Sequence, residues 1–207
     1  MTVKKRGVKS ILGEAAMLGV CIIFFIPFYY LLVNTFKPAR EATVSPLSLP
    51  VKSFTLDLYR QALNTINFWS SFRNSILITV VSVVIIISIG SMASYAISRR
   101  KNKLTQFLFF YFLIGFMVPV QTTLIPLFNL MSFLKLQNSV AGMIVLYSSW
   151  CNFAMFMYQG FLGGVPKDLE EAALIDGANL WKLFWWIVFP LLKPVTTTIV
   201  IFDVMWI

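Results

Sequence analysis

Residues 74–98 read NSILITVVSVVIIISIGSMASYAIS, and the residues that follow are Arg99-Arg100-Lys101. The quoted stretch carries no charge and is longer than the ~20 apolar residues that cross the hydrocarbon core of a bilayer. Within it, Gly90, Ser94 and Ser98 place small side chains on one helical stripe, which favours close packing against another helix. The stretch therefore predicts a transmembrane helix and a membrane protein.

Other uncharged runs predict further spans on both sides of this one. They are Ala15–Phe36, Gln106–Val120, Val140–Phe161 and a last run that starts near Leu191. Pro119 and Pro126 interrupt the chain after the third span, which predicts a broken or re-entrant piece there. The predicted fold is therefore all-α, a polytopic transmembrane helical bundle of about five spans. Too few residues remain between Leu191 and Ile207 for a comfortable crossing, so we expect the last span to be cut short and the chain to be incomplete.

Basic residues set the expected orientation in the cytoplasmic membrane. Clusters lie at 4–9 and 99–103, whereas Lys135 is alone in the segment 129–139. Because Lys and Arg gather on the cytoplasmic side, we expect the N-terminus inside and residues 37–73 outside. The chain then divides into residues 1–73, the first span with an extracellular loop, and residues 74–207, an incomplete core. A short helix is expected near Leu56–Leu63.

The composition argues against several classes of function. Hydrophobic residues make up 58% of the chain and charged ones 12%, whereas a soluble domain has about a quarter charged residues. The net charge of +9 does not indicate nucleic acid, because the basic residues lie in short clusters between apolar runs. There is no histidine, and Cys21 and Cys151 both lie inside apolar runs, so neither a metal site nor a disulfide framework is predicted.

A second informative stretch lies at residues 165–179 and reads VPKDLEEAALIDGAN. Pro166 suits the first turn of a helix. Acidic residues follow where the helix dipole favours negative charge: Asp168, Glu170 and Glu171. Gly177 suits a left-handed C-cap, and Asn179 suits the N-cap of a second helix that starts at Leu180. The pattern predicts a short helix–turn–helix in a cytoplasmic loop at about 162–189.

Three interpretations of this loop are open. It could be an amphipathic helix on the lipid surface, a plain helical loop, or a docking element for a cytoplasmic protein. Lipid-surface helices carry Lys and Arg on the polar face, whereas this one has a single Lys167 and an acidic leading edge. Ala172 and Ala173 bury little area in lipid but allow another protein surface to come close. These residues favour docking.

Here the sequence resembles a known family. Glu171-Ala-Ala, Gly177 and Ile187-Val-Phe-Pro190 resemble the EAA loop of the membrane subunits of ABC importers, with Phe189 in place of the usual leucine. Further segments resemble the carbohydrate-uptake branch: Phe72-Arg-Asn-Ser75, Ser91-Met-Ala-Ser-Tyr-Ala96, Val118-Pro-Val-Gln121, Ile125-Pro-Leu-Phe128 and Glu170–Asn179. The chain is similar over nearly its whole length to the maltose-type permease subunit with a short N-terminus.

The resemblance implies a type I ABC importer permease core with several partners. It pairs with a second permease subunit, expected to form a heterodimer, and with two ATPase subunits that bind ATP and Mg²⁺. An extracellular sugar-binding protein delivers the sugar. No Gly-x-x-x-x-Gly-Lys-Ser/Thr loop is present in this sequence, so we expect no nucleotide, cofactor or catalytic residue in the chain itself.

The resemblance also assigns roles within the loop. The residues implied in ATPase coupling are Glu170, Glu171, Ala172, Ala173, Asp176, Gly177 and Pro190. Glu171 is expected to contact a basic or polar group on the ATPase, and Ala172 and Ala173 to pack in its cleft. Gly177 is expected to permit the sharp turn.

A sugar pathway needs aromatic faces for the rings and polar side chains for the hydroxyl groups. Residues of these types are Gln121, Thr122, Tyr147, Ser148, Trp150 and Asn152. The same types also gather at membrane interfaces and between helices, so packing is the favoured interpretation for any one of them and substrate contact the alternative. Asp203 lies too deep in the last run to reach the headgroups, and we expect it to face the bundle interior. There it is a further candidate for the substrate pathway, and contact with another helix is equally open.

Other classes of protein fit less well. An ABC permease for a non-sugar solute is an open alternative, because no residue identifies the solute. An ion-coupled secondary transporter would show internal repeats and several buried ionisable groups, of which only Asp203 qualifies. A membrane-embedded enzyme would need a cluster of reactive side chains, and the chain has no histidine.

Overall fold

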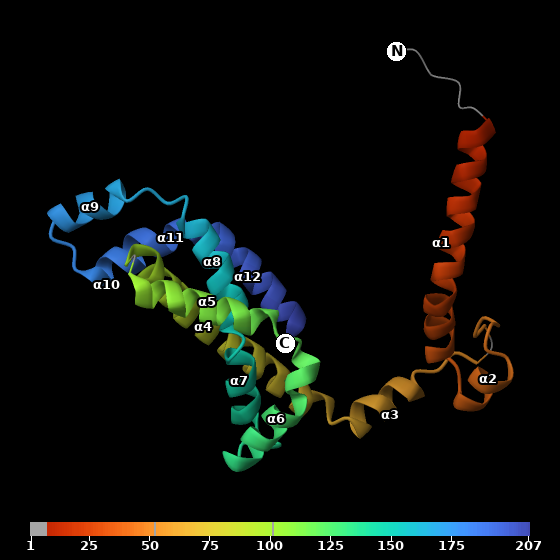
Figure 1. Cartoon of the computed structure of the whole chain (residues 1–207). Helices are drawn as coiled ribbons and strands as arrows, with labels where there is room; N and C mark the ends of the chain where they lie inside the picture. Colours follow the sequence, from red (N-terminus) through yellow and green to blue (C-terminus); the bar gives the residue numbers. More distant parts are fainter. Residues whose placement is uncertain (1–7, 52, 101) are drawn as a thin grey trace. The chain divides into compact units, whose positions relative to one another are not determined.

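The computed structural model describes residues 8–51, 53–100 and 102–207, and all regular structure in this described part is helical (Figure 1). The all-α prediction is therefore confirmed. Side chains are described from Leu12 onwards. Part of the predicted orientation depends on basic residues outside the described ones, namely Lys4, Lys5, Arg6 and Lys101.

The chain forms two compact units, residues 1–71 and 72–207. In the first unit, α1 (Val8–Thr35) contains an apolar helix over Leu12–Thr35 that is long enough to cross a membrane, as predicted. Only 6% of its most apolar window is buried. A helix with apolar side chains exposed all round needs lipid or another protein around it, because water would be an unfavourable solvent for that surface.

The segment after α1 folds back onto the end of that helix. Lys37 is fully buried, and its Nζ donates to the carbonyl of Ser45 at 2.7 Å. Asn34 Nδ2 donates to Pro46 O at 2.9 Å, and the Tyr29 hydroxyl donates to Leu47 O at 3.0 Å. These bonds enclose α2 (Ala39–Val44), a helix that the sequence did not predict, whereas the helix expected near Leu56–Leu63 is α3 (Asp57–Thr65).

The second unit contains the remaining predicted spans. Its helices up to residue 162 are α4 (Phe68–Arg99), α5 (Lys103–Met117), α6 (Val120–Phe133), α7 (Val140–Ser148) and α8 (Cys151–Leu162). The predicted second span is α4, which begins earlier than expected. The predicted fourth span is α7 and α8 together, and Val140–Leu162 qualifies as one membrane span.

The interruption predicted after the third span is present at Pro119, where α5 and α6 are bent by 102°. Proline has no N–H and disfavours helical geometry in the residue before it, so the chain turns there. The interruption predicted at Pro126 is wrong, because Pro126 lies inside α6. Its fixed φ is compatible with a helix, and one lost hydrogen bond does not end α6.

The chain ends in several short helices and one long one. They are α9 (Asp168–Ile175), α10 (Leu180–Lys182), the π-helix η1 (Leu183–Val188), α11 (Phe189–Leu191) and α12 (Lys193–Trp206). The fifth span, expected from near Leu191, corresponds to α12. This helix has 14 residues and qualifies as a span only together with Leu180–Leu191, from which it is bent by 75°. The π-helix was not predicted. It precedes Pro190, which lacks an N–H, and the Phe189 N–H donates to Phe184 O across the wider turn.

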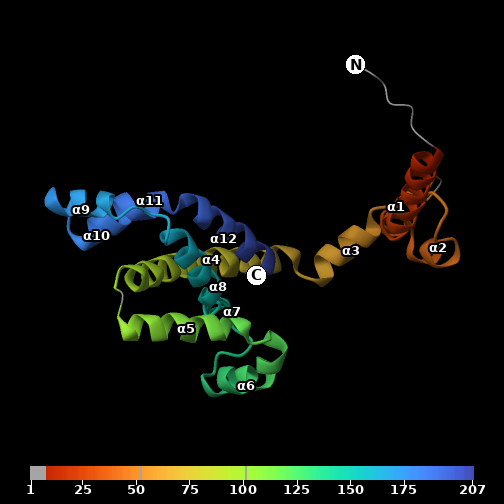
Figure 2. The same cartoon turned by 45° about the horizontal axis from the view of Figure 1, so that its top comes forward.

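The core of the second unit forms around α8, which contacts both α5 and α12. Gly90 and Ser94 are buried, and Ser94 Oγ donates to Met155 O at 3.1 Å. A Cβ atom at Gly90 would lie only 3.1 Å from the Cβ of Ala154. The small-residue stripe of α4 therefore brings α4 and α8 close together, as predicted. Figures 1 and 2 show α9 and α10 at one end of this unit and α6 away from them.

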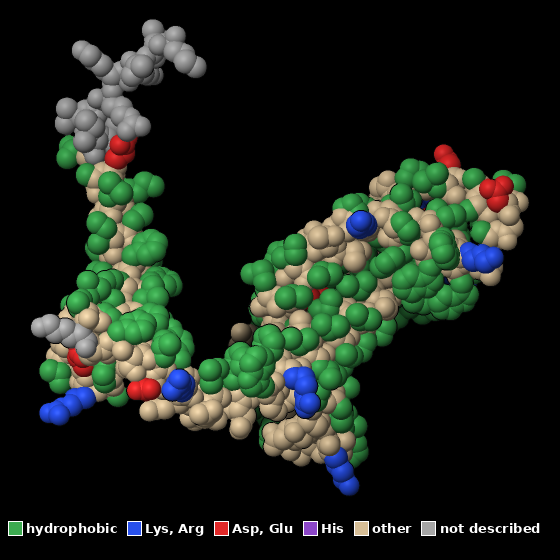
Figure 3. Space-filling model, turned by 180° about the vertical axis from the view of Figure 1, so that it is seen from behind, with side chains coloured by type: hydrophobic (Ala, Val, Ile, Leu, Met, Phe, Trp, Pro, Cys, Tyr) green, Lys and Arg blue, Asp and Glu red, His purple; other side chains and the backbone are tan. Residues whose placement is uncertain are grey.

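The molecular surface has the character of a membrane protein. Among the residues that the structure describes, three helices are long and apolar enough to cross a membrane, or up to five spans are present if each bent pair counts as one. Figure 3 shows hydrophobic side chains spread over the visible face, with Lys, Arg, Asp and Glu at a few separate places. The predicted number of about five spans agrees with the upper count.

Candidate functional site

The loop singled out by the sequence forms a helix with defined ends. Its C-terminus has a Schellman motif: the Gly177 N–H donates to Leu174 O at 3.1 Å, and the Ala178 N–H donates to Ala173 O at 3.0 Å. Gly177 has φ +83°, the left-handed conformation that was predicted. Asn179 then caps the next helix, and its side-chain oxygen accepts from the Lys182 N–H at 2.8 Å.

The start of α9 differs from the prediction. Lys167 is the N-cap residue, so Pro166 lies before the helix instead of in its first turn. The Pro166 side chain is exposed, and neighbouring Val165 is buried. Val165 packs in the hydrophobic core, and this contact decides where the chain turns away from the core before α9 begins. A rule based on proline alone does not take that contact into account.

The two faces of α9 have different surroundings. Glu170 and Ala173 are each 7% exposed, whereas Glu171 and Ala172 are exposed to solvent. A spacing of three residues places the buried pair on one helix face. Ala173 packs within the chain's own hydrophobic core, so it is not free to fill a partner's cleft as the resemblance implied. Glu171 and Ala172, together with Ile175, which is 86% exposed, form the outer face.

Glu170 is held by side chains of a distant helix. Its Oε1 accepts from Arg99 Nε at 2.8 Å, and its Oε2 accepts from the Tyr95 hydroxyl at 2.8 Å. The family resemblance implies that Glu170 belongs to the ATPase-coupling set, but the sequence gives no sign of its partners, which lie 71 and 75 residues away. In the sequence, the signal that could have indicated this contact was Arg99, a basic residue at the end of an uncharged span. Basic residues at such positions are also explained by membrane topology.

The remaining residues of the predicted coupling set lie at the ends of the short helices. Asp176 is the exposed C-cap residue of α9. Pro190 is exposed in α11, after the π-helix. Both belong to the segment that links α9 to the fifth span, and neither lies on the outer face of α9.

A cavity of about 560 Å³ lies among the predicted spans. It brings together four of the seven residues predicted for a substrate pathway: Gln121, Trp150, Asn152 and Asp203. Aromatic side chains complete its wall: Phe116, Phe153, Phe202 and Trp206. An aromatic wall with a few polar groups is the usual composition of a small-molecule site. The two interruptions at Pro119 and Trp150 both lie on the cavity wall.

The other predicted pathway residues do not line this cavity. Thr122 is exposed, and its hydroxyl donates to Pro119 O at 2.7 Å within α6. Tyr147 packs edge-on against Trp150, with ring centroids 6.4 Å apart. Ser148 Oγ is buried and has no hydrogen-bond partner among the described residues. Thr122 and Tyr147 therefore support neighbouring parts of the chain.

Asp203 faces the interior, as predicted. Its Oδ2 is buried and has no hydrogen-bond partner among the described residues. Buried polar atoms in proteins almost always have a partner, so an unpaired carboxylate oxygen in a cavity wall is available to a ligand hydroxyl or to water. Asp203 is the most polar group in the cavity, and the amides of Gln121 and Asn152 line the same space.

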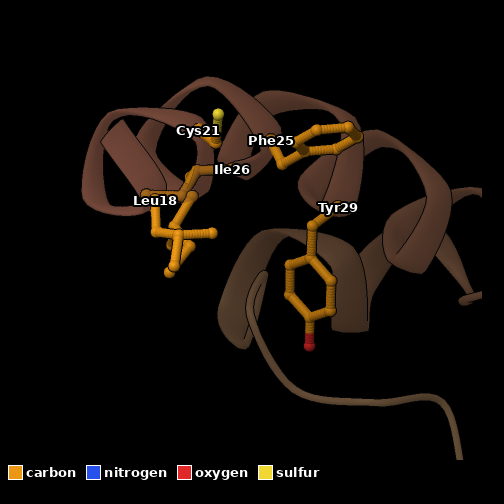
Figure 4. Close-up of a pocket in the computed structure, with 6 residues that line it drawn as sticks. Leu18, Cys21, Phe25, Ile26 and Tyr29 are labelled. Atoms are coloured by element: carbon orange, nitrogen blue, oxygen red, sulfur yellow. The ribbon is translucent and has the colours of Figure 1, made fainter. Parts of the chain in front are cut away.

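Another hollow, of about 360 Å³, lies on α1 (Figure 4). Its lining residues follow one face of that helix: Leu18, Cys21, Ile22, Phe25, Ile26 and Tyr29. The Tyr29 hydroxyl is already bonded to Leu47 O at 3.0 Å, so the hollow brings no free polar groups together. Within the described residues, no group of three or more His, Cys, Asp or Glu side chains is placed to hold a metal ion.

Comparison with known sequences identifies the family. Residues 86–207 match the family described as binding-protein-dependent transport system inner membrane component. The matched segment is more than half of the chain and contains α9 together with most of the cavity wall. The chain therefore belongs to this family of membrane transport components.

Curated relatives match almost the whole chain. The starch degradation products transport system permease protein AmyC of Thermoanaerobacterium thermosulfurigenes, a probable assignment in its own name, is 38% identical over 90% of this chain and 68% of its own length. The melibiose/raffinose/stachyose import permease MelC of Bacillus subtilis is 33% identical over 91% and 68%. The diacetylchitobiose uptake permease NgcG of Streptomyces coelicolor is 28% identical over 93% and 64%. The chain thus spans about two thirds of the length of these relatives.

The turn at Gly177 gives a direct prediction. Gly177→Val should abolish transport while the protein still inserts into the membrane, because a β-branched residue is strained at φ +83°. A Cβ atom there meets nothing within 4 Å, so the effect comes from the backbone alone. The left-handed conformation costs an ordinary residue roughly 1–2 kcal/mol. The measurement is solute uptake, normalised to the amount of the protein in the membrane fraction.

Gly177→Asn is the matched control, since asparagine tolerates the left-handed region better than other residues do. It should retain most of the uptake. Normal uptake by the valine variant would show that the Schellman turn does not matter for transport.

Proposed function

We propose that this chain is the membrane-spanning permease subunit of an ATP-driven importer that carries a sugar across the cytoplasmic membrane. The observation that carries the proposal is the similarity to relatives whose names specify oligosaccharide uptake, over about nine tenths of this chain. ATP hydrolysis would belong to a separate pair of ATPase subunits. A second permease subunit and an extracellular sugar-binding protein complete the expected assembly.

The cavity supports the choice of a sugar as the solute. Trp150 offers an aromatic face to a pyranose ring, and the amides of Gln121 and Asn152 can bond ring hydroxyls. Asp203 adds an acceptor with an unpaired oxygen. Such a site suits a neutral polyhydroxylated solute better than an anion, which the Asp203 carboxylate would repel. An importer for a non-sugar solute is the alternative.

Solute identity can be tested by uptake in the organism that carries this gene. Deleting the gene should abolish uptake of at least one labelled oligosaccharide from a panel of starch fragments, raffinose and diacetylchitobiose, the solutes in the relatives' names. Restoring the wild-type gene should restore uptake. Loss of uptake only for an osmolyte or an amino acid would support the alternative solute class and contradict the sugar assignment.

Within that assay, Trp150→Ala should raise the apparent KM for the sugar about two- to tenfold, as expected for loss of an aromatic contact of about 0.5–1.5 kcal/mol. Trp69→Ala is the matched control, because Trp69 is 79% exposed and does not line the cavity.

Uptake driven by an ion gradient would persist after ATP depletion, and that result would favour a secondary transporter.

We propose that the end of the second unit that holds α9 faces the cytoplasm and that residues 37–73 face outward. Support comes from the basic cluster at 99–103, which begins at the last residue of α4. The partner of Glu170 is Arg99, so α9 must lie at this same end of α4. A docking surface for a cytoplasmic ATPase needs this orientation.

The orientation predicts a labelling pattern in intact cells. In a background where Cys21 and Cys151 are replaced by serine, Ser48→Cys should react with a membrane-impermeant maleimide, and Arg100→Cys should react only after the cells are opened. Both positions are exposed in the structure, so accessibility of the side chain does not decide the result. If Arg100→Cys alone were labelled in intact cells, the membrane orientation would be the reverse of the one proposed.

We propose that the outer face of α9 docks on an ATPase subunit, with Glu171 as its charged contact. Glu171 and Ala172 are exposed on that face, next to the apolar Ile175. A helix on the lipid surface would place basic residues beside its apolar ones, whereas the charged residues on α9 are acidic. The small Ala172 allows the backbone of a partner to come close.

Charge reversal at Glu171 separates docking from lipid contact. If α9 docks on the ATPase, the amount of ATPase recovered with the permease from detergent should fall in the order wild type, Glu171→Gln, Glu171→Lys. The reason is that truncating a buried charge pair costs about 2–5 kcal/mol. If α9 lies on lipid, the lysine should strengthen attachment to anionic headgroups. Equal ATPase recovery from all three proteins would remove Glu171 from the interface.

A further inference from the structure

The Glu170 carboxylate and the Arg99 guanidinium form a buried link between two helices. Arg99 is the last residue of α4, and Glu170 lies in the first turn of α9. Their side chains are 15% and 9% exposed. Both oxygens of the carboxylate are used, since Oε1 accepts from Arg99 Nε and Oε2 from the Tyr95 hydroxyl, each at 2.8 Å. The orientation of Glu170 is therefore fixed by two residues of α4.

The same guanidinium holds a third part of the chain. Arg99 Nη1 lies 3.5 Å from Leu162 O, the last residue of α8, and Nη2 donates to Val165 O at 3.3 Å. Leu162 O also accepts from the Val165 N–H at 3.3 Å, and Val165 itself lies in the segment between α8 and α9. Arg99 thus connects the ends of α4 and α8 with the start of α9. Lysine could not form this set of bonds, because it lacks the planar fork of N–H donors.

A buried ion pair of this kind is suited to fixing geometry more than to raising stability. Removing two charges from water offsets most of their attraction, whereas removing only one partner leaves an uncompensated buried charge. The link therefore resists separation of α9 from α4 during a movement. It also sets their mutual orientation, because each of its hydrogen bonds is directional.

From this link, α4 and α8 lead towards the cavity. Ser94 of α4 donates to Met155 O of α8 at 3.1 Å, and Gly90 packs directly on Ala154. Asn152 and Phe153, at the start of α8, line the cavity. Packed helices with few voids transmit displacement because they are not easily compressed. A continuous packed path thus runs from Glu170 to the cavity wall.

We propose that Glu170 is a positioning residue that passes movement of α9 to α4 and α8 through Arg99, and that it does not contact the ATPase. The inference rests on the proposed function, in which an ATPase moves α9 during its cycle. It divides two adjacent acidic residues by role: exposed Glu171 binds the ATPase, and buried Glu170 connects that contact to the membrane helices. Breaking the link should leave the ATPase bound and active but should uncouple ATP hydrolysis from sugar transport.

The test uses the complete transporter, purified with its ATPase subunits and reconstituted in liposomes, where ATP hydrolysis and sugar uptake are measured in parallel. Glu170→Gln and Arg99→Lys should retain the wild-type amount of ATPase subunit. Sugar transported per ATP hydrolysed should fall about tenfold in each, which corresponds to about 1.4 kcal/mol of coupling free energy. The double variant should be little worse than either single one, because both remove the same interaction.

Neighbouring residues provide matched controls. Arg100→Lys changes an exposed arginine beside Arg99 and should leave the ratio of transport to hydrolysis unchanged. Glu171→Gln should show the opposite defect to Glu170→Gln, losing ATPase subunit while the complexes that remain keep the normal ratio. If Glu171→Gln retains its ATPase and Glu170→Gln still lowers the ratio, the docking contact is wrong and the link stands.

Two outcomes would overturn the link. An unchanged ratio in both Glu170→Gln and Arg99→Lys would show that the pair does not transmit movement. Loss of ATPase subunit from Glu170→Gln, as from Glu171→Gln, would make Glu170 a docking contact. If Glu170→Gln does not accumulate in the membrane, Tyr95→Phe decides, because it removes one hydroxyl from the same carboxylate. It should lower the ratio in the same direction, and an unchanged ratio would again contradict the proposal.

Discussion

The constraint on which the whole structure depends is that a chain in hydrocarbon must satisfy its backbone hydrogen bonds internally. That constraint explains why the described residues form helices and why the interruptions are informative. Irregular backbone at membrane depth is tolerated only where protein or a water-filled space covers it. The interruptions at Pro119 and Trp150 both lie on the wall of the cavity. Two of the helix breaks therefore lie where the chain lines a cavity, as this constraint requires.

Much of this arrangement follows from local sequence signals. Uncharged runs predict the spans because length and hydropathy alone decide whether a helix can cross a membrane. Pro119, Gly177 and Asn179 were interpreted correctly because each acts on its own backbone or on that of its near neighbours. The family resemblance added the interpretation of the 165–179 loop, which these signals support but do not by themselves identify.

The features that sequence reasoning missed depend on contacts between distant residues. The short helix α2 is enclosed by bonds from Lys37, Asn34 and Tyr29, and no local pattern shows that a lysine there is buried. Ala173 was expected to face a partner, but the core of its own chain takes up that side of α9. Pro126 was expected to break a helix that continues through it. Tertiary packing accounts for α2 and for Ala173. α6 has no buried residue, and it continues because a helix tolerates the one hydrogen bond that Pro126 removes.

The same reasoning explains how one short helix can serve both a partner and its own chain. In α9 the buried positions are separated by three residues, so the chain's own contacts occupy one face and leave the other free. Glu170 and Glu171 are adjacent in sequence but lie on these two different faces. The same carboxylate group is therefore buried in one residue and exposed to solvent in the other. A buried carboxylate needs a cation of its own, which Arg99 supplies. An exposed one is solvated and available for exchange with a second protein. The geometry of the helix thus places Glu170 against its own chain and Glu171 at the surface.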